Sequence, residues 1–186
     1  MLSFYKRNIK KVLFCIPFAN KWILNLRSRN TPVLIRQRYD VREIFLNENT
    51  EKGFNRYDII VRLLAIECEK GLNDCGWDFY RRMQSARMGK SWVEPAVERF
   101  KNLISSYEQN GYNQESEIEL DNSLHLIDGS HRMAMALFYN QPVISARVNP
   151  QKVDVFYGIE WFRINGFTEN ECNLLENRFQ TIIGGG

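Results

Sequence analysis

The chain has 186 residues, of which 44% are hydrophobic and 25% are charged. This length suits one well-buried domain with an additional lobe and is short for two independent domains, and the composition is that of an ordinary soluble globular protein. The formal net charge of +3 is unevenly distributed: residues 1–40 carry nine Lys or Arg and one acid, and the remainder carries sixteen basic and twenty-one acidic residues. We therefore expect a mildly acidic body with a strongly basic N-terminal arm.

The four cysteines argue against a disulfide framework and against a zinc site. They form no C-x-x-C pair and have no metal-ligand spacing with either histidine. Scattered single cysteines are typical of proteins in a reducing cytosol, so we expect a cytoplasmic location. The cysteines are Cys15, Cys68, Cys75 and Cys172.

The basic arm superficially resembles a signal peptide, because basic residues precede the apolar stretch 12–19. No small-x-small cleavage site follows, and a proline and polar residues interrupt the stretch 12–26, which falls short of the ~20 apolar residues of a membrane span. Two interpretations stay open: a helix packed on the domain, or an amphipathic segment on an anionic membrane surface. The second would place the protein peripherally at the inner face of the membrane.

The first elements after the arm alternate in type. Residues 31–41 read as a strand that leads into a turn. Residues 57–70 have the length and composition of a helix, and Gly71 is a plausible stop. The segment 73–77 is turn-like, and 77–87 reads as a second helix with a basic face.

The clearest helical pattern begins at Glu94, with Pro95 suited to the first helical position. Apolar residues then recur on one face, and Asn110-Gly111 forms a left-handed stop. The expected core face of this helix is Val97, Phe100, Leu103, Ile104 and Tyr107.

Strands dominate the next predicted segment. Residues 116–120 and 123–127 read as short strands around an Asp-Asn turn, 131–139 as a helix and 143–148 as a further strand. This order predicts a small mixed sheet in an α/β (α+β) fold. His125, which would lie within the second strand, is expected to be a packing residue.

The C-terminal part reads as two helices, separated by Asn165-Gly166, with Thr168-x-x-Glu171 as a capping box for the second. The predicted organisation has three parts. They are a basic arm and helical addition over 1–90, a core over 91–150, and C-terminal helices over 151–183.

One short motif carries most of the chemistry. The stretch LIDGSHRMAMAL, residues 126–137, passes from an apolar strand through Asp-Gly-Ser-His-Arg into a helix. A helix start offers unpaired N–H groups and a favourable dipole to an anion, typically a phosphate. Glycine permits a close backbone approach and positive φ, and arginine can bind phosphate oxygens bidentately. The motif residues are Asp128, Gly129, Ser130, His131 and Arg132.

A plain helix cap is the competing interpretation, with Asp128 or Ser130 as the N-cap. Arg132 argues mildly against it, because a cation at a helix start is unfavourable without an anion to meet it. Asp128 is unusual beside a phosphate unless it holds a metal or accepts a proton from a substrate hydroxyl.

The motif and its context resemble the ParB/sulfiredoxin superfamily, over roughly residues 94–148. There a strand, D/G-G-x-H-R and an Ala-rich helix form a nucleotide-binding site. Sulfiredoxins have a reactive cysteine where this chain has Ser130, so their activity is not expected. ParB proteins continue into a large DNA-binding region, whereas 38 residues follow Val148 here and the body is acidic, so no DNA partner is expected.

The closest resemblance is to the free-serine kinase branch, whose motif is D-G-H-H-R. It implies ATP or ADP with Mg²⁺ as cofactor, held by Gly129, Ser130, His131 and Arg132. It also implies Glu94 as the base that activates an acceptor hydroxyl, with Glu98 as the alternative. Ser130 departs from the first histidine of that motif, which bears on phosphate contacts and nucleotide preference.

Further polar or charged side chains could bind the acceptor. Arg147 and Asn149 follow a predicted strand end, where α/β sheets often bind ligands. A second set could clamp an acceptor phosphate or form a solvated face with ion pairs to neighbouring acids. That set is Arg56, Arg62, Arg81, Arg82, Arg87 and Lys90.

The main hypothesis is a nucleotide-dependent phosphotransferase acting on a hydroxyl of a small molecule or glycan, with catalytic Glu94, Asp128 and His131 and with Arg81 and Arg147 binding substrate. The alternative is a non-catalytic nucleotide-binding or scaffold module, because the combination also resembles ParB-like proteins associated with bacterial surface-polysaccharide synthesis. A nuclease is a weaker interpretation, since the motif supplies few metal-binding carboxylates.

Overall fold

A computed structural model describes residues 36–184 apart from 52, 114–115 and 151–155. These residues belong to one compact unit, Ile35–Gly186. The stretch 12–26 of the basic arm, with its two open interpretations, lies outside the described residues. None of the helices that the structure describes is both long and apolar enough to cross a membrane.

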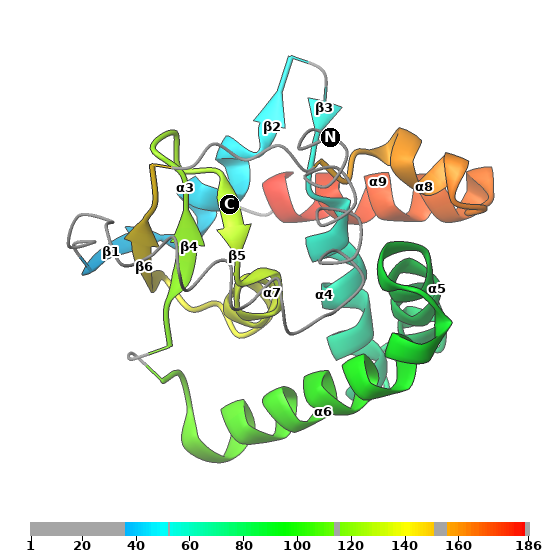
Figure 1. The fold of residues 1–186 in the computed structure, drawn as a ribbon, viewed down its shortest axis with the longest axis horizontal. Coiled ribbons are helices and arrows are strands. Elements are labelled where there is room, and N and C mark those ends of the chain that lie inside the picture. Colours follow the sequence, from blue (N-terminus) through cyan, green and yellow to red (C-terminus); the bar gives the residue numbers. More distant parts are fainter. Residues whose placement is uncertain (1–35, 52, 114–115, 151–155, 185–186) are drawn as a thin grey trace, which may run out of the picture. The chain divides into compact units, whose positions relative to one another are not determined.

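The fold is mixed α/β, as predicted, with one small mixed sheet and a two-stranded ribbon (Figure 1). The strands are β1 (Arg36–Asp40), β2 (Asn49–Thr50), β3 (Gly53–Phe54), β4 (Ile118–Leu120), β5 (Leu126–Asp128) and β6 (Val143–Val148). The helices are α3 (Val41–Asn47), α4 (Tyr57–Glu69), α5 (Gly76–Met88), the 3₁₀ turn η2 (Lys90–Trp92), α6 (Val93–Asn110), α7 (Ser130–Phe138), α8 (Ile159–Ile164) and α9 (Glu169–Gly184).

The main sheet has the order β1-β6-β4-β5. β6 pairs antiparallel with β1 and parallel with β4, and β4 pairs antiparallel with β5. The parallel pair needs a crossover, and β5 and α7 supply it, which places the start of α7 directly after an edge strand (Figure 1).

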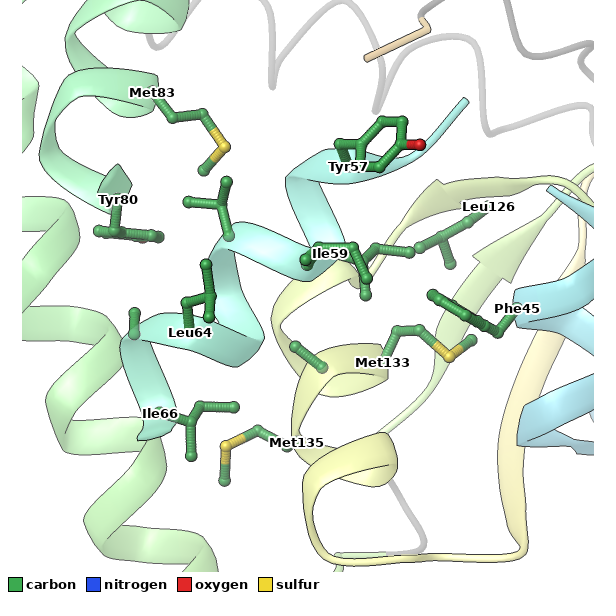
Figure 2. Packing of buried hydrophobic residues seen from close by; sticks show 14 of the residues in the cluster. Phe45, Tyr57, Ile59, Leu64, Ile66, Tyr80, Met83, Leu126, Met133 and Met135 are labelled. Carbon is green, nitrogen blue, oxygen red and sulfur yellow. The ribbon is translucent and has the colours of Figure 1, made fainter. Parts of the chain in front are cut away.

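α4 is the central helix. Its residues from Tyr57 to Ile66 are all buried, and most of them are apolar, as expected for a helix packed on several sides. Figure 2 shows α4 between Tyr80 and Met83 of α5 on one side and Met133 and Met135 of α7 on the other.

Helix α5 approaches α4 closely enough to require a glycine. A Cβ atom on Gly76 would lie 1.9 Å from the carbonyl oxygen of Leu64. The start of α5 is therefore packed directly against the backbone of α4, and this contact aligns the two helices that form one wall of the site described below.

Most predicted elements are confirmed, and the differences have local causes. The strand over 143–148 and the helix over 57–70 agree with β6 and α4. α6 begins at Val93, which makes Pro95 the third helical residue; proline is tolerated there because the first N–H groups of a helix have no intrahelical partner.

The two strands around the Asp-Asn turn are shorter than predicted. Asp121 Oδ1 accepts the N–H groups of Ser123 at 2.8 Å and His125 at 2.9 Å, and Leu124 has φ +62°. These bonds extend the turn, so β5 begins only at Leu126. The placement of His125 within a strand is therefore wrong: it lies in the turn, with Nδ1 3.5 Å from Asp121 Oδ2.

The capping box of α9 is confirmed. Thr168 N–H donates to Glu171 Oε2 at 2.7 Å, and Glu171 N–H donates to Thr168 Oγ1 at 3.3 Å. The same carboxylate forms an ion pair with Arg82 of α5, so this cap also ties α9 to α5.

Candidate functional site

The turn from β5 into α7 depends on glycine. Gly129 has φ +106°, and a Cβ atom there would lie 2.5 Å from Cγ2 of Ile118 in β4. The predicted positive φ is confirmed. The close approach of the backbone that was expected toward a ligand is made here to the neighbouring strand β4. Glycine therefore allows the chain to turn tightly over the sheet and begin α7 at Ser130.

The plain-cap interpretation of Asp128 and Ser130 is wrong. The N-cap of α7 is Gly129, and no side chain caps the helix. Asp128 Oδ1 instead accepts the N–H of Gly129 at 2.7 Å. Ser130 Oγ instead accepts a hydrogen bond from Arg56 Nη2 at 2.7 Å.

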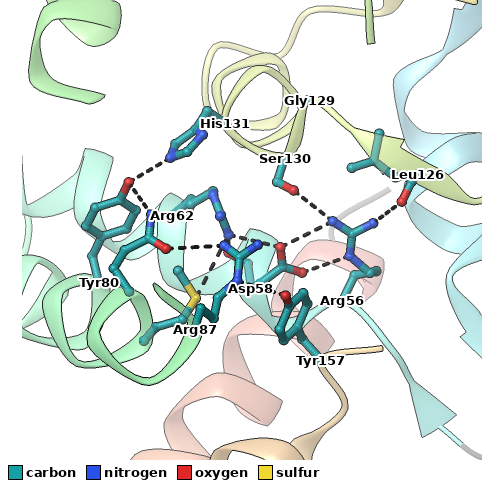
Figure 3. A network of polar contacts seen from close by, with 12 residues as sticks. Arg56, Asp58, Arg62, Tyr80, Arg87, Leu126, Gly129, Ser130, His131 and Tyr157 are labelled. Carbon is teal, nitrogen blue, oxygen red and sulfur yellow. Dashed lines mark hydrogen bonds and ion pairs between the residues drawn. The ribbon is translucent and has the colours of Figure 1, made fainter. Parts of the chain in front are cut away.

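Arg56 belongs to a buried charged cluster (Figure 3). Its Nε donates to Asp58 Oδ1 at 2.8 Å, and Arg62 Nη1 donates to Asp58 Oδ2 at 2.9 Å. All three side chains are at most 5% exposed. Burial alone would raise the pKa of Asp58, but the two guanidinium groups hold that pKa well below its usual value, so the carboxylate is charged.

A second carboxyl group, Glu48, lies beside this cluster. It accepts the N–H of Leu126 at 2.7 Å and lies 3.8 Å from Arg56 Nη1. Burial raises the pKa of Glu48, while Arg56 opposes that rise. Arg56 thus joins α3, α4 and the start of α7, and it aims the Ser130 hydroxyl.

A cavity of about 870 Å³ opens beside this cluster. Asp128, Ser130 and His131 line it from the β5–α7 turn, and Phe100 and Leu103 of α6 supply apolar wall. Four arginines also line it, each from a different position in the fold. They are Arg56 before α4, Arg62 in α4, Arg87 in α5 and Arg99 in α6.

His131 is held as a neutral imidazole. Burial and the charges of Arg62 and Arg87 lower its pKa well below the usual value. Its Nε2 lies 2.8 Å from the hydroxyl oxygen of Tyr80, which also accepts a hydrogen bond from Gln84 Nε2 at 2.8 Å (Figure 3). The Tyr80 hydroxyl hydrogen has two possible acceptors, His131 Nε2 at 2.8 Å and the Ala96 carbonyl oxygen at 3.5 Å, and the shorter distance favours donation to Nε2 and therefore a proton on Nδ1.

The structure does not bring Glu94 to the cavity. Its side chain is 70% exposed and its Oε1 accepts a hydrogen bond from Arg81 Nε at 2.9 Å. Neither residue lines the cavity, and neither does Glu98, which is exposed. Glu94 and Arg81 form a surface pair at the junction of α5 and α6.

The remaining predicted residues are also engaged elsewhere. Arg132 Nη1 donates to the carbonyl oxygen of Glu117 at 3.1 Å, and Arg147 forms ion pairs with Glu117 and Glu119. Arg82 pairs with Glu171, as described above. Of the predicted arginine clamp, Arg56, Arg62 and Arg87 line the cavity and the others do not.

Sequence reasoning missed Asp58, Arg99, Tyr80 and Tyr157 as site residues. One signal was present, because Asp58 and Arg62 stand four residues apart within an otherwise apolar helix, which indicates a buried ion pair. The others carry no local signal.

No family model, no curated protein and no solved structure matches this chain.

Proposed function

We propose that this protein binds a nucleotide through its phosphates in the cavity at the start of α7. The observation that carries the proposal is the hydrogen bond of 2.7 Å from Arg56 to Ser130. It fixes the serine hydroxyl at the first residue of α7, on the wall of an arginine-lined cavity. Because Arg56 donates to Ser130 Oγ, the hydroxyl proton of Ser130 is available to donate to a ligand oxygen.

Phosphate matches the chemistry of this wall. The start of α7 has no side-chain cap, so its first N–H groups and its dipole favour an anion. Arginine is suited to planar, bidentate contacts with phosphate oxygens. A volume of about 870 Å³ lies within the usual size of small-molecule sites and can accept a nucleotide.

The resemblance to the ParB/sulfiredoxin superfamily supports a nucleotide as the phosphate-bearing ligand. Among the described residues there is no group of three or more His, Cys, Asp and Glu side chains suited to a metal ion. Mg²⁺ usually takes one or two carboxylates together with substrate phosphates. In a non-catalytic site Asp128, on the cavity wall, would hold Mg²⁺ with the nucleotide.

Calorimetric titration of the full chain with ADP and ATP, each with and without Mg²⁺, tests the proposal. Ser130→Ala should weaken binding roughly tenfold, as expected for a lost hydrogen bond to a charged phosphate. Arg163→Gln is the control, because Arg163 pairs with Glu160 and Glu169 and does not line the cavity. Equal affinities for Ser130→Ala and the wild type, or no binding of either nucleotide at millimolar concentration, would refute the proposal.

Phosphotransfer is a second candidate, because the carboxylate of Asp128 lines the same cavity. An acceptor hydroxyl oxygen would form a bond to the terminal phosphorus, the bond to the bridging oxygen would break, and the proton would pass to a carboxylate. Given its place on the wall, we propose Asp128 for this role instead of Glu94.

Phosphorus NMR with ATP or ADP, Mg²⁺ and a panel of polyols, amino acids and sugars tests this step. A new phosphoester signal that disappears in Asp128→Asn but persists in Glu94→Gln would support Asp128. The reverse pattern would restore Glu94 as the base. Nucleotide binding without any new signal across the panel favours the non-catalytic module.

The basic arm of residues 1–40 supports peripheral contact with an anionic membrane, which co-sedimentation with anionic vesicles can measure.

A further inference from the structure

The four cavity arginines fall into two pairs that differ in their partners. Arg56 and Arg62 share the carboxylate of Asp58 and belong to the buried cluster. Arg87 and Arg99 form no ion pair with a carboxylate in the part of the chain that the structure describes. The first pair is largely compensated within the protein, whereas the second presents positive charge to the cavity.

Arg87 is held in place by neutral groups. Its Nε donates to the hydroxyl of Tyr157 at 2.8 Å, its Nη1 donates to Gln84 Oε1 at 3.3 Å, and its guanidinium carbon lies 4.6 Å from the centre of the Tyr157 ring (Figure 3). These contacts orient the guanidinium group without neutralising it, and the Tyr157 ring also lines the cavity.

Arg99 reaches the same region from α6. It lines the cavity and makes no hydrogen bond or ion pair with any residue that the structure describes. Arg87 and Arg99 line the same cavity, and the charges of both act on the buried His131 and Tyr80 in its wall. Two like charges that line one cavity, neither of them paired with a described carboxylate, favour the binding of an anion.

The cavity also contains an unused donor. Arg62 Nε is buried and has no hydrogen-bond partner in the described structure, although its side chain is 2% exposed and lines the cavity. Buried polar groups are normally paired, so an unpaired guanidinium nitrogen at a cavity wall indicates a missing acceptor. This nitrogen lies on α4, which packs against α5, the helix that carries Arg87.

We propose that Arg87 and Arg99 form a second anion subsite in this cavity, which binds a phosphate group other than the one at Ser130. The first subsite, at Ser130 and the start of α7, rests on the proposed function. The second subsite rests on Arg87 and Arg99. The cavity thus takes two phosphate groups, either as a second phosphate of the nucleotide or as a phosphorylated acceptor.

Inorganic phosphate is the probe, titrated calorimetrically into the full chain at low ionic strength. The wild type should bind two phosphate ions. Arg99→Gln should weaken one of them roughly tenfold, the usual effect of losing a charge-assisted hydrogen bond. Since Arg99 is exposed and makes no hydrogen bond or ion pair with any described residue, this variant should fold normally, and Arg87→Gln provides a second test. Arg163→Gln removes the same charge from the surface and should leave both sites intact.

The outcomes separate this subsite from the proposed function. If Arg99→Gln and Arg87→Gln bind phosphate as Arg163→Gln does, the second subsite is wrong. If the arginine variants weaken phosphate binding while no nucleotide binds, the second subsite stands and the proposed function fails. The same phosphate titration in the presence of saturating ADP identifies the occupant of the second subsite. If phosphate still binds and Arg99→Gln weakens that binding, the subsite takes a separate phosphorylated acceptor. If ADP abolishes the phosphate binding that depends on Arg99, the subsite takes a second phosphate of the nucleotide.

Discussion

Arg56 Nη2 donates a hydrogen bond of 2.7 Å to Ser130 Oγ, which joins the residue before α4 to the first residue of α7, 74 positions later. The same guanidinium group is paired with Asp58. The orientation of Ser130 therefore depends on a buried ion pair in another part of the chain. Disturbing that pair should affect both the stability of the fold and the candidate site.

Asp58→Asn should destabilise the protein by about 3–5 kcal/mol, because it leaves two buried guanidinium groups without their carboxylate. The pKa of Asp58 is depressed in the folded state, so its contribution is present above the unfolded pKa of about 3.9 and is lost as the pH falls further. Urea unfolding at several pH values checks this. The difference from wild type should be constant between about pH 5 and 8 and shrink below about pH 4.

Asp78→Asn is the control for that substitution, since the side chain of Asp78 is 66% exposed. It should change the free energy of unfolding by less than about 0.5 kcal/mol. Equal effects of the two variants would contradict the assignment of Asp58 as the centre of the buried cluster.

His131→Gln should flatten the pH dependence of stability on the acidic side of neutrality. The folded-state pKa of His131 is depressed, so its stabilising contribution is complete above the unfolded pKa of about 6.5 and falls as the pH decreases, by up to about 1.4 kcal/mol per pH unit. The raised pKa of Glu48 acts in the opposite direction, but it is common to both proteins. The wild-type minus variant difference between pH 7 and 5 therefore isolates His131, and His125→Gln serves as the matched histidine control.

Gly129→Ala should cost about 2–4 kcal/mol, because it combines an unfavourable positive φ with a collision against Ile118. Gly166→Ala has φ +84° but open space around the added Cβ, so it should cost only about 1–2 kcal/mol. Thermal or urea unfolding of both variants separates the two contributions. Equal losses would mean that Ile118 moves away without cost.

Two substitutions at Glu171 should separate its two roles. Glu171→Gln preserves a capping side chain but removes the ion pair with Arg82, which is partly exposed and is expected to contribute about 0.5–1 kcal/mol. Glu171→Ala also removes the side-chain acceptor of the Thr168 N–H, whereas the bond from the backbone N–H of residue 171 to Thr168 Oγ1 remains, and it should cost about 0.5–1 kcal/mol more. An alanine variant as stable as the glutamine variant would show that the Glu171 half of the capping box contributes nothing.

The sequence alone predicted much of the secondary structure, because the signals involved are local. The length of an apolar run and a glycine stop identified α4, apolar periodicity identified α6, and Thr168-x-x-Glu171 marked the start of α9. The strand limits were less accurate, since the side chain of Asp121 bonds to backbone N–H groups and extends a turn into residues of strand-like composition. Such side-chain bonds compete with strand pairing for the backbone N–H groups.

The candidate site was also predicted only in part from the sequence. The Asp-Gly-Ser-His-Arg motif was recognisable because a strand, a glycine turn and a helix start are contiguous in the sequence. Glu94 was assigned by resemblance, and its side chain turns to Arg81 on the surface. Arg99 and Tyr157 could not be chosen, because nothing in their neighbouring residues distinguishes them from other surface positions.

By itself the sequence determined where an anion-suited helix start would occur, since that depends on a few consecutive residues and on the backbone geometry they allow. Only the tertiary structure decided which charges would meet it. Arg56, Tyr80 and Arg87 reach the cavity because α4 and α5 pack against α7 and against each other. Packing through a buried apolar core joins residues far apart in the chain, and the burial that it creates sets the charge states of Asp58 and His131.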